Sequence, residues 1–147
     1  MTRNLEEMFA CRDLRTSPLV VVQVAAAARI AILFAHAGRD YLPGTAVRLR
    51  SMRAANALQR LLATVNEVWP HAFLTRRPCC CALSPDESVL ADLALAALHG
   101  NRPAAIAATC ELLPAASRDR IFTDMIELVD AIRATEVDPA QVGTALE

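Results

Sequence analysis

Residues 18–37 form a nearly unbroken apolar run, PLVVVQVAAAARIAILFAHA, which any fold of this chain has to shield from water. Thr16-Ser17-Pro18 is a typical helix start, with polar N-cap candidates ahead of a proline. Gly38 suits the left-handed conformation that ends many helices. The run therefore predicts one long helix. Because that helix is apolar on all sides, we expect it to be the most buried element of the fold.

The same run is long enough to raise the alternative of a membrane span. Arg29 lies near its centre, and Gln23 and His36 add polar groups that also oppose insertion into lipid. We therefore expect a core helix, and membrane association is not favoured. Arg29 and His36 are seven residues apart and share one stripe, which predicts that both lie at an edge of the bundle.

Composition favours a single all-α domain over residues 1–147. Of the 147 residues, 54% are apolar and only 4% are aromatic, with 4 glycines. This composition suits helix packing and disfavours sandwiches and barrels. We predict an irregular bundle of about five helices, with an arm at residues 1–15 and a frayed tail at 137–147. After the first helix, the expected helices span residues 45–69, 84–98, 102–113 and 118–135.

Apolar spacing predicts which side chains of these helices face the core. The inner positions expected in the 45–69 helix include Val47 and Met52. Those expected in the 102–113 helix are Ile106, Cys110 and Leu113. The last helix is expected to bury Ile121, Phe122, Met125, Leu128, Val129 and Ile132. Three arginines of the 45–69 helix, at positions 50, 53 and 60, share an outer face. That face could bind an anion, but a solvated charged surface is the commoner arrangement.

The densest group of reactive side chains is the stretch RRPCCCALSPDE at residues 76–87. Cys79, Cys80 and Cys81 follow Arg76-Arg77 and precede a strong helix start. In that start, Ser84 is the N-cap, proline takes the first position and Glu87 the third, which together predict a capping box. Nearby guanidinium groups and a positive helix end both favour thiolate. We therefore expect Cys81 to form a thiolate more readily than the other four cysteines of the chain.

Three roles fit the adjacent cysteines, and the sequence leaves all three open. They could be redox thiols, because a charged setting and a neighbouring resolving thiol favour reversible oxidation. They could bind a metal such as zinc, although adjacent ligands point apart, with help from His71, Cys11 or a second chain. They could also be small residues buried in a tight turn. Solvent exposure decides between these roles, because a buried thiol does not react.

The run from AANAL in the 45–69 helix through a basic segment to PCCC and the acidic helix start resembles a family of small helical bacterial proteins. The resemblance covers roughly residues 50–135 and rests on PCCC and the Asp-Glu pair after the capping serine. That family has no assigned activity. The resemblance implies a helical domain and draws attention to Cys79, Cys80 and Cys81.

Charge and missing motifs narrow the functional classes. Residues 1–83 carry 11 Arg against 5 acids and residues 84–147 carry 4 Arg against 11 acids, so the two parts have charges of +6 and −7. Such parts attract each other or a second copy, and we expect a homodimer. Five cysteines, an odd number with three adjacent, are unlike a secreted disulfide framework, so we expect the cytoplasm as the compartment. Without a basic block or stacking aromatics, a nucleic-acid partner is not favoured. Lysine is absent, which excludes Schiff-base chemistry and the lysine phosphate loop.

These observations favour a non-enzymatic interaction or regulatory module that binds a protein partner through a helical surface. The alternative is a thiol-based redox sensor or metal-binding protein centred on Cys79, Cys80 and Cys81.

Overall fold

A computed structural model describes residues 12–136, and over that range the fold is an all-α bundle, as predicted. A short 3-10 turn at Leu14–Thr16 precedes the helices. These are α2 (Leu19–His36), α3 (Leu42–Leu49), α4 (Met52–Val68), α5 (Pro85–His99), α6 (Arg102–Thr109) and α7 (Ala115–Arg133). The expected tail at 137–147 and most of the expected arm at 1–15 lie outside the described residues.

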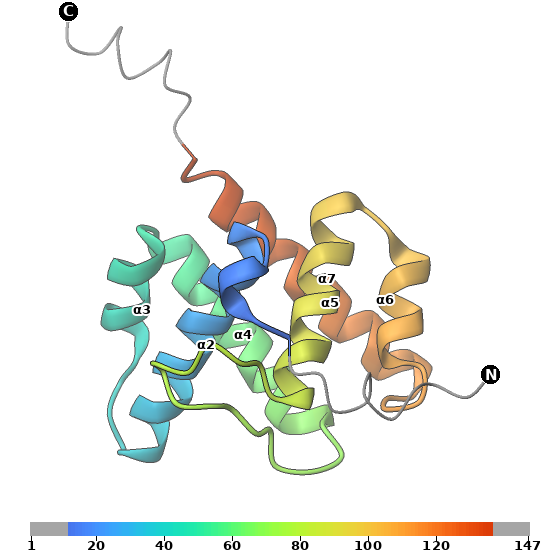
Figure 1. Cartoon of the computed structure of the whole chain (residues 1–147), viewed down its shortest axis with the longest axis horizontal. Coiled ribbons are helices and arrows are strands. Elements are labelled where there is room, and N and C mark those ends of the chain that lie inside the picture. The colour runs from blue at the N-terminus through green and yellow to red at the C-terminus, as the bar shows by residue number, and fades with distance from the viewer. Residues whose placement is uncertain (1–11, 137–147) are drawn as a thin grey trace, which may run out of the picture.

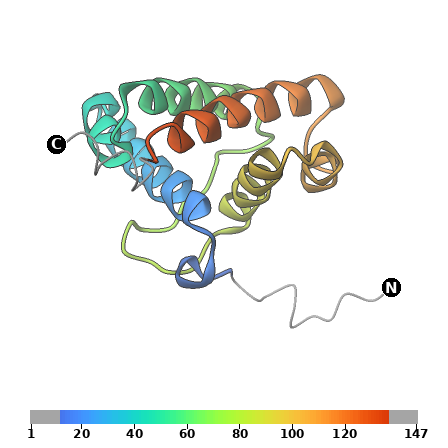
Figure 2. The ribbon, with the colours of Figure 1, turned by 90° about the horizontal axis from the view of Figure 1, so that it is seen from above.

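The helices are arranged in two layers (Figures 1 and 2). One layer is α4 beside α7, and the second contains α2 and α5. Figure 1 shows α3 and α6 at opposite ends of the molecule. The α4–α5 connection, residues 69–84, runs beside α2 (Figures 1 and 2), and Arg29 of α2 binds the carbonyl of Cys80.

α2 confirms the predicted apolar helix, and eight of its residues are buried. It is the one helix between residues 12 and 136 that has the length and composition to cross a membrane, but it packs against α3 and α5 as a core helix does. Its remaining stripe is half-covered, with Leu19 64% and Leu33 53% exposed. The edge position predicted for Arg29 is wrong, since this residue is 2% exposed, whereas His36 is exposed.

The helix predicted at 45–69 is two helices, which adds one to the expected five. α3 begins within the predicted loop at Leu42, and the chain leaves it at Arg50, which adopts a left-handed conformation with φ 56°. The Oγ of Ser51 then accepts a hydrogen bond from the N–H of Ala54 and begins α4. This break changes the helical phase between Val47 and Met52. Both residues were expected inside and are instead 79% and 54% exposed.

The inner face of α6 also differs from the prediction. Ile106 is 44% exposed and Cys110 is an exposed thiol, while Leu113 is buried as expected. The buried positions of α6 are Ala105 and Thr109, and the Thr109 hydroxyl donates to the Ala105 carbonyl. Because that local hydrogen bond satisfies the hydroxyl, a polar residue can take the inner position that apolar spacing had given to Cys110. The apolar stripe predicted for α7 is buried throughout.

Candidate functional site: an anchored cysteine turn

The three adjacent cysteines lie in a hydrogen-bonded turn, residues 77–82, that we name the cysteine turn. The N–H of Cys80 donates to the carbonyl of Arg77 at 2.9 Å. Pro78 occupies the second position of that turn, where its fixed φ is favourable. The sequence Arg-Pro-Cys-Cys therefore reverses the chain locally, before any tertiary contact is considered.

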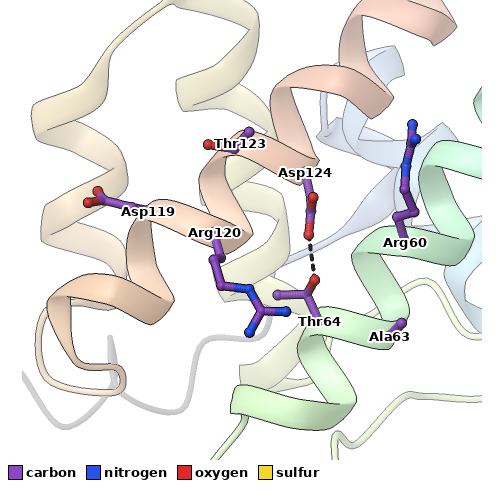
Figure 3. Close-up of a pocket in the computed structure, with 7 residues that line it drawn as sticks. All are labelled: Arg60, Ala63, Thr64, Asp119, Arg120, Thr123 and Asp124. Carbon is purple, nitrogen blue, oxygen red and sulfur yellow. Dashed lines mark hydrogen bonds between the residues drawn. The ribbon is translucent and has the colours of Figure 1, made fainter.

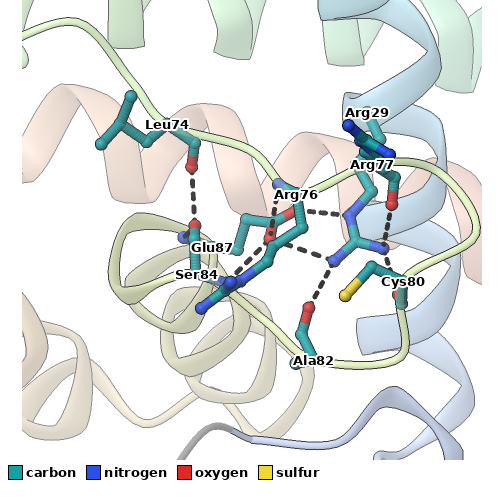
Figure 4. Close-up of polar contacts among 8 residues, drawn as sticks. All are labelled: Arg29, Leu74, Arg76, Arg77, Cys80, Ala82, Ser84 and Glu87. Carbon is teal, nitrogen blue, oxygen red and sulfur yellow. Dashed lines mark hydrogen bonds and ion pairs between the residues drawn. The ribbon is translucent and has the colours of Figure 1, made fainter. Parts of the chain in front are cut away.

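The guanidinium of Arg29 anchors the cysteine turn and lies among the carbonyls that it binds (Figure 4). Its Nη1 donates to the carbonyls of Arg77 at 3.2 Å and Cys80 at 2.6 Å, and its Nη2 donates to the carbonyl of Ala82 at 2.8 Å. Its Nε and Nη2 also bind the two carboxylate oxygens of Glu87, at 2.6 and 3.1 Å. All five guanidinium donors are used, which a buried charge requires.

The N-terminus of α5 supplies the second set of anchors, and the predicted capping box is confirmed. The Ser84 hydroxyl accepts from the N–H of Glu87 at 3.0 Å, and Glu87 Oε1 accepts from the N–H of Ser84 at 2.9 Å. The same hydroxyl donates to the carbonyl of Leu74 at 2.6 Å, and Glu87 Oε1 also accepts from the N–H of Arg76 at 3.2 Å. The capping residues therefore also order the connection that precedes their helix.

His71 and Asp86 lie together at the start of this connection. The Nε2 of His71 is 3.1 Å from Asp86 Oδ1, and Asp86 Oδ2 accepts from the N–H of Leu74 at 2.8 Å. Asp86 is buried, whereas half of the His71 side chain is exposed. The structure therefore places His71, our predicted metal ligand, beside a carboxylate rather than beside the cysteines.

The segment before α2 covers the far side of the cysteine turn. Leu14 N–H donates to the carbonyl of Cys81 at 2.7 Å, and Leu83 N–H donates to the carbonyl of Arg12 at 2.8 Å, which forms a single antiparallel bridge. This contact brings Arg15 towards Cys81. The pKa of Arg15 is raised, first by its hydrogen bond to Asp13, then by the charge of that carboxylate and by the charge of Cys81. Sequence reasoning had given this role to Arg76 and Arg77.

The sulfur-bearing side chains remain open to solvent although their backbone is held. Cys79 and Cys81 are exposed and Cys80 is half-buried, so the alternative of three small buried residues is wrong for two of them. Within residues 12–136, no three His, Cys, Asp or Glu side chains form a group that could hold a metal ion. Cys11 lies outside the described residues. A zinc site shared between two chains remains a prediction.

Arg29 is the residue of this site that sequence reasoning missed. The available signal was its isolation, because a single charge within a long apolar helix needs a buried counter-charge if the helix is in the core. The sequence predicted Glu87 only as a capping residue. Glu87 lies 58 positions after Arg29, so no local pattern indicates that the two residues meet.

A hollow of about 500 Å³ between α4 and α7 is another candidate site (Figure 3). Thr64 donates to Asp124 across it at 2.5 Å, while Arg120 pairs with Glu67 and Arg60 with Glu127. Arg60 belongs to the predicted arginine face, whose three members are all exposed. Because the charges around this hollow are largely paired with one another, it is a weaker candidate site than the cysteine turn.

The fold and the site define a class: a small helical domain that displays an anchored cysteine turn. No family model matches the chain, and neither a curated protein nor a solved structure matches it. The likeness to helical bacterial proteins with a PCCC motif therefore stays a prediction.

Proposed function

We propose that this protein is a non-enzymatic thiol-based redox sensor whose sensing element is the cysteine turn. The observation that carries the proposal is the contrast between backbone and side chains. Three carbonyls of the turn are bound by the buried guanidinium of Arg29, while Cys79 and Cys81 present exposed sulfurs. A sensor requires such exposure, because thiolate character and access set oxidation rates.

Cys81 is the residue that we expect to react first, because it is exposed and its carbonyl accepts from the N–H of Leu14, which brings the neighbouring Arg15 to this part of the turn. A hydroperoxide is the oxidant class: the thiolate attacks the O–O bond, forming Cys81 sulfenic acid and releasing an alcohol or, from hydrogen peroxide, water once the leaving oxygen is protonated. The Cys79 thiolate then attacks the sulfenic sulfur. A disulfide forms, and the hydroxyl leaves as water after taking up a proton. The two thiols lose two electrons in total and the peroxide gains them.

Chain geometry favours Cys79 as the resolving thiol. Neighbouring Cα atoms are about 3.8 Å apart, which is shorter than the separation of about 4.4–6.8 Å that disulfides prefer. Residues 79 and 81 can reach that separation when the chain between them bends. Bending there moves the carbonyls of Cys80 and Ala82, both of which bind Arg29. The oxidised turn would therefore loosen the contact between α2 and α5, which gives the sensor an output.

The test is mass spectrometry of thiols alkylated after brief exposure of the native protein to hydrogen peroxide. Cys110 is the internal control, since it is equally an exposed thiol but lies outside the turn. We expect the Cys79–Cys81 disulfide to form while Cys110 stays reduced, and Cys81→Ser to abolish it. Oxidation of Cys110 as fast as that of Cys81 would contradict the proposal. The cytoplasm is the compartment that suits it, because thiols there are kept reduced until challenged.

A second candidate function, an interaction module that assembles with a second copy, is favoured by the half-covered stripe of α2. Its members alternate in steps of four and three residues, the spacing of a helix-pairing seam: Leu19, Gln23, Ala26, Ile30 and Leu33. The side-chain oxygen of Gln23 is buried without a donor within the described residues. A polar side chain in such a seam commonly pairs with its counterpart and fixes the register of two helices. We therefore assign the homodimer contact to this stripe.

A further inference from the structure

A groove of about 780 Å³ lies on the α2–α4 side of the molecule, away from the sulfurs of the cysteine turn. The C-terminal half of α2 and the middle of α4 form its walls, and the segment Trp69–Leu74 closes one end. Apolar side chains, including Ile32, Leu62 and Val65, line it. A mostly apolar concavity of this size is typical of a site for a small ligand.

Trp69 provides an independent sign of a missing partner. The residue lines the groove and is 7% exposed, yet its indole Nε1 has no acceptor within residues 12–136. Buried indole N–H groups usually have an acceptor. The ring of Phe73, half-buried and also lining the groove, lies edge-on to the indole with centroids 5.1 Å apart.

The polar lining of the groove is rich in donors and contains no carboxylate. Asn66 and Gln59 contribute amides. Burial, and next the charge of Asp40, raise the pKa of Tyr41, so its hydroxyl stays protonated. His36 and His71 also line the groove, and the Nε2 of His71 lies 3.1 Å from Asp86 Oδ1. His71 Nδ1 therefore remains as a donor when the ring is protonated.

We propose that this groove binds an amphipathic carboxylate, of the class of a medium-chain fatty acid. The hydrocarbon chain lies against the apolar walls between α2 and α4. The carboxylate lies at the Trp69 end, where it accepts from the indole N–H and from His71. An amphipathic cation is disfavoured there, since the lining contains no carboxylate that could pair with its charge.

The chain contains a single tryptophan, so its fluorescence reports directly on this groove. The experiment titrates the full chain with decanoate below its micelle concentration, and with decanol and decyltrimethylammonium as probes of equal chain length. We expect saturable change of Trp69 emission at one decanoate per chain, with much weaker binding of the other two. Equal responses to all three probes would overturn the carboxylate assignment.

Two variants locate the site without removing core residues. Ala35 lines the groove and is exposed, so Ala35→Phe fills the groove without unfolding the chain, and we expect it to abolish binding. Ala116→Phe, an exposed position on α7 away from the groove, is the matched control. Binding that survives Ala35→Phe would refute the site. Loss of a dimer on Ala35→Phe, with no decanoate binding by either chain, would identify a second copy as the occupant and also refute the proposal.

His71→Gln tests the assigned head-group contact, and His99→Gln, at the exposed end of α5, is its control. We expect about a tenfold loss of decanoate affinity from the first, equivalent to about 1.4 kcal/mol, and none from the second. Equal affinity in both variants would remove His71 from the site. This proposal is independent of the redox function, since replacement of Cys79 and Cys81 by Ser should leave decanoate binding unchanged.

Discussion

Arg29 joins the core to the surface through one side chain. It is among the largest fully buried side chains of the described residues, and its partners are three backbone carbonyls and the carboxylate of Glu87. A buried ion pair is not stabilising by default, because desolvation opposes the attraction. Here the hydrogen bonds to the carbonyls complete the coordination, so removing one member leaves several groups unsatisfied.

Arg29→Met is expected to destabilise the fold by about 3–5 kcal/mol, because it leaves Glu87 charged and buried and removes the Arg29 donors from the carbonyls of Cys80 and Ala82. Urea unfolding followed by circular dichroism measures the change. Arg60→Met is the matched control, since the Arg60–Glu127 pair is 62% and 49% exposed and such pairs contribute about 0–1 kcal/mol. Equal losses in the two variants would show that the contacts of Arg29 contribute little.

Adding Glu87→Met to Arg29→Met refines the same measurement. The double variant has no unpaired charge, so part of the stability should return. The carbonyls of Cys80 and Ala82 still lack the Arg29 donors, and the N–H groups of Ser84 and Arg76 lose the Glu87 acceptor, so recovery should be incomplete. Full recovery would mean that the ion pair, and not the carbonyl contacts, accounts for the effect of Arg29.

Sequence reasoning succeeds at the residue scale where the cause is local. The capping box needs only Ser84 and Glu87, three positions apart, and both of its hydrogen bonds are present. It fails where the partner is distant, as for Arg29, or where a local hydrogen bond allows a polar residue inside, as for Thr109 in place of Cys110. The extra contacts of the capping residues with Leu74 and Arg76 also depend on tertiary docking, which no spacing rule encodes.

At the scale of elements, the residues that cap the N-terminus of α5 also order the connection that precedes this helix. Ser84 caps the helix and also holds the Leu74 carbonyl, while Ser51 at the start of α4 caps with the single hydrogen bond to Ala54. The two serines therefore offer a comparison between a cap alone and a cap that also anchors a loop.

Ser84→Ala is expected to cost about 2 kcal/mol, against about 1 kcal/mol for Ser51→Ala, because the first variant also leaves a loop carbonyl without its donor. Ser84→Ala should in addition change the alkylation rates of Cys79 and Cys81, whereas Ser51→Ala should not. Thermal unfolding and timed alkylation read by mass spectrometry measure the two effects. Cysteine rates that are the same in both variants would show that the cap does not order the turn.

The division between α3 and α4 shows the limit of periodicity. Apolar spacing continues across residues 45–69, yet Ser51 offers an N-cap and Arg50 accepts a left-handed conformation, which non-glycine residues adopt at some cost. Tertiary packing decides between one long helix and two. Here α3 packs on α2 and also folds back onto α4. A single straight helix over residues 45–69 could not make the second contact.

For the whole molecule, the all-α fold and the central helix follow from the composition and the apolar run, because both reflect how much surface has to be buried. The face of that helix which stays half-covered does not follow from them. Surface that remains uncovered in one chain is available to another chain, and the expected homodimer is argued from this face.

Ala26 lies midway along the α2 stripe, so Ala26→Glu places a charge at the proposed contact without cutting into the buried side of the helix. We expect sedimentation to give a dimer for the parent chain at micromolar concentration and a monomer for Ala26→Glu. Ala116→Glu, at an exposed position on α7, should remain dimeric. A parent chain that sediments as a monomer would exclude this interface, and a dimer that tolerates Ala26→Glu would place the contact elsewhere.

The reach of Arg29 also bears on the order in which the chain folds. Its acceptors lie 48 to 58 positions further along, so the guanidinium leaves the ribosome well before the groups that bind it have been made. Closing so long a segment has an entropic cost that is recovered only after α2 and α5 dock. The local reversal at residues 77–80 does not depend on that docking, but the anchoring of the cysteine turn by Arg29 does, so it should be among the last steps of folding. Until then its thiols belong to a flexible chain, and their pairing with wrong partners is a hazard of synthesis rather than of the finished protein.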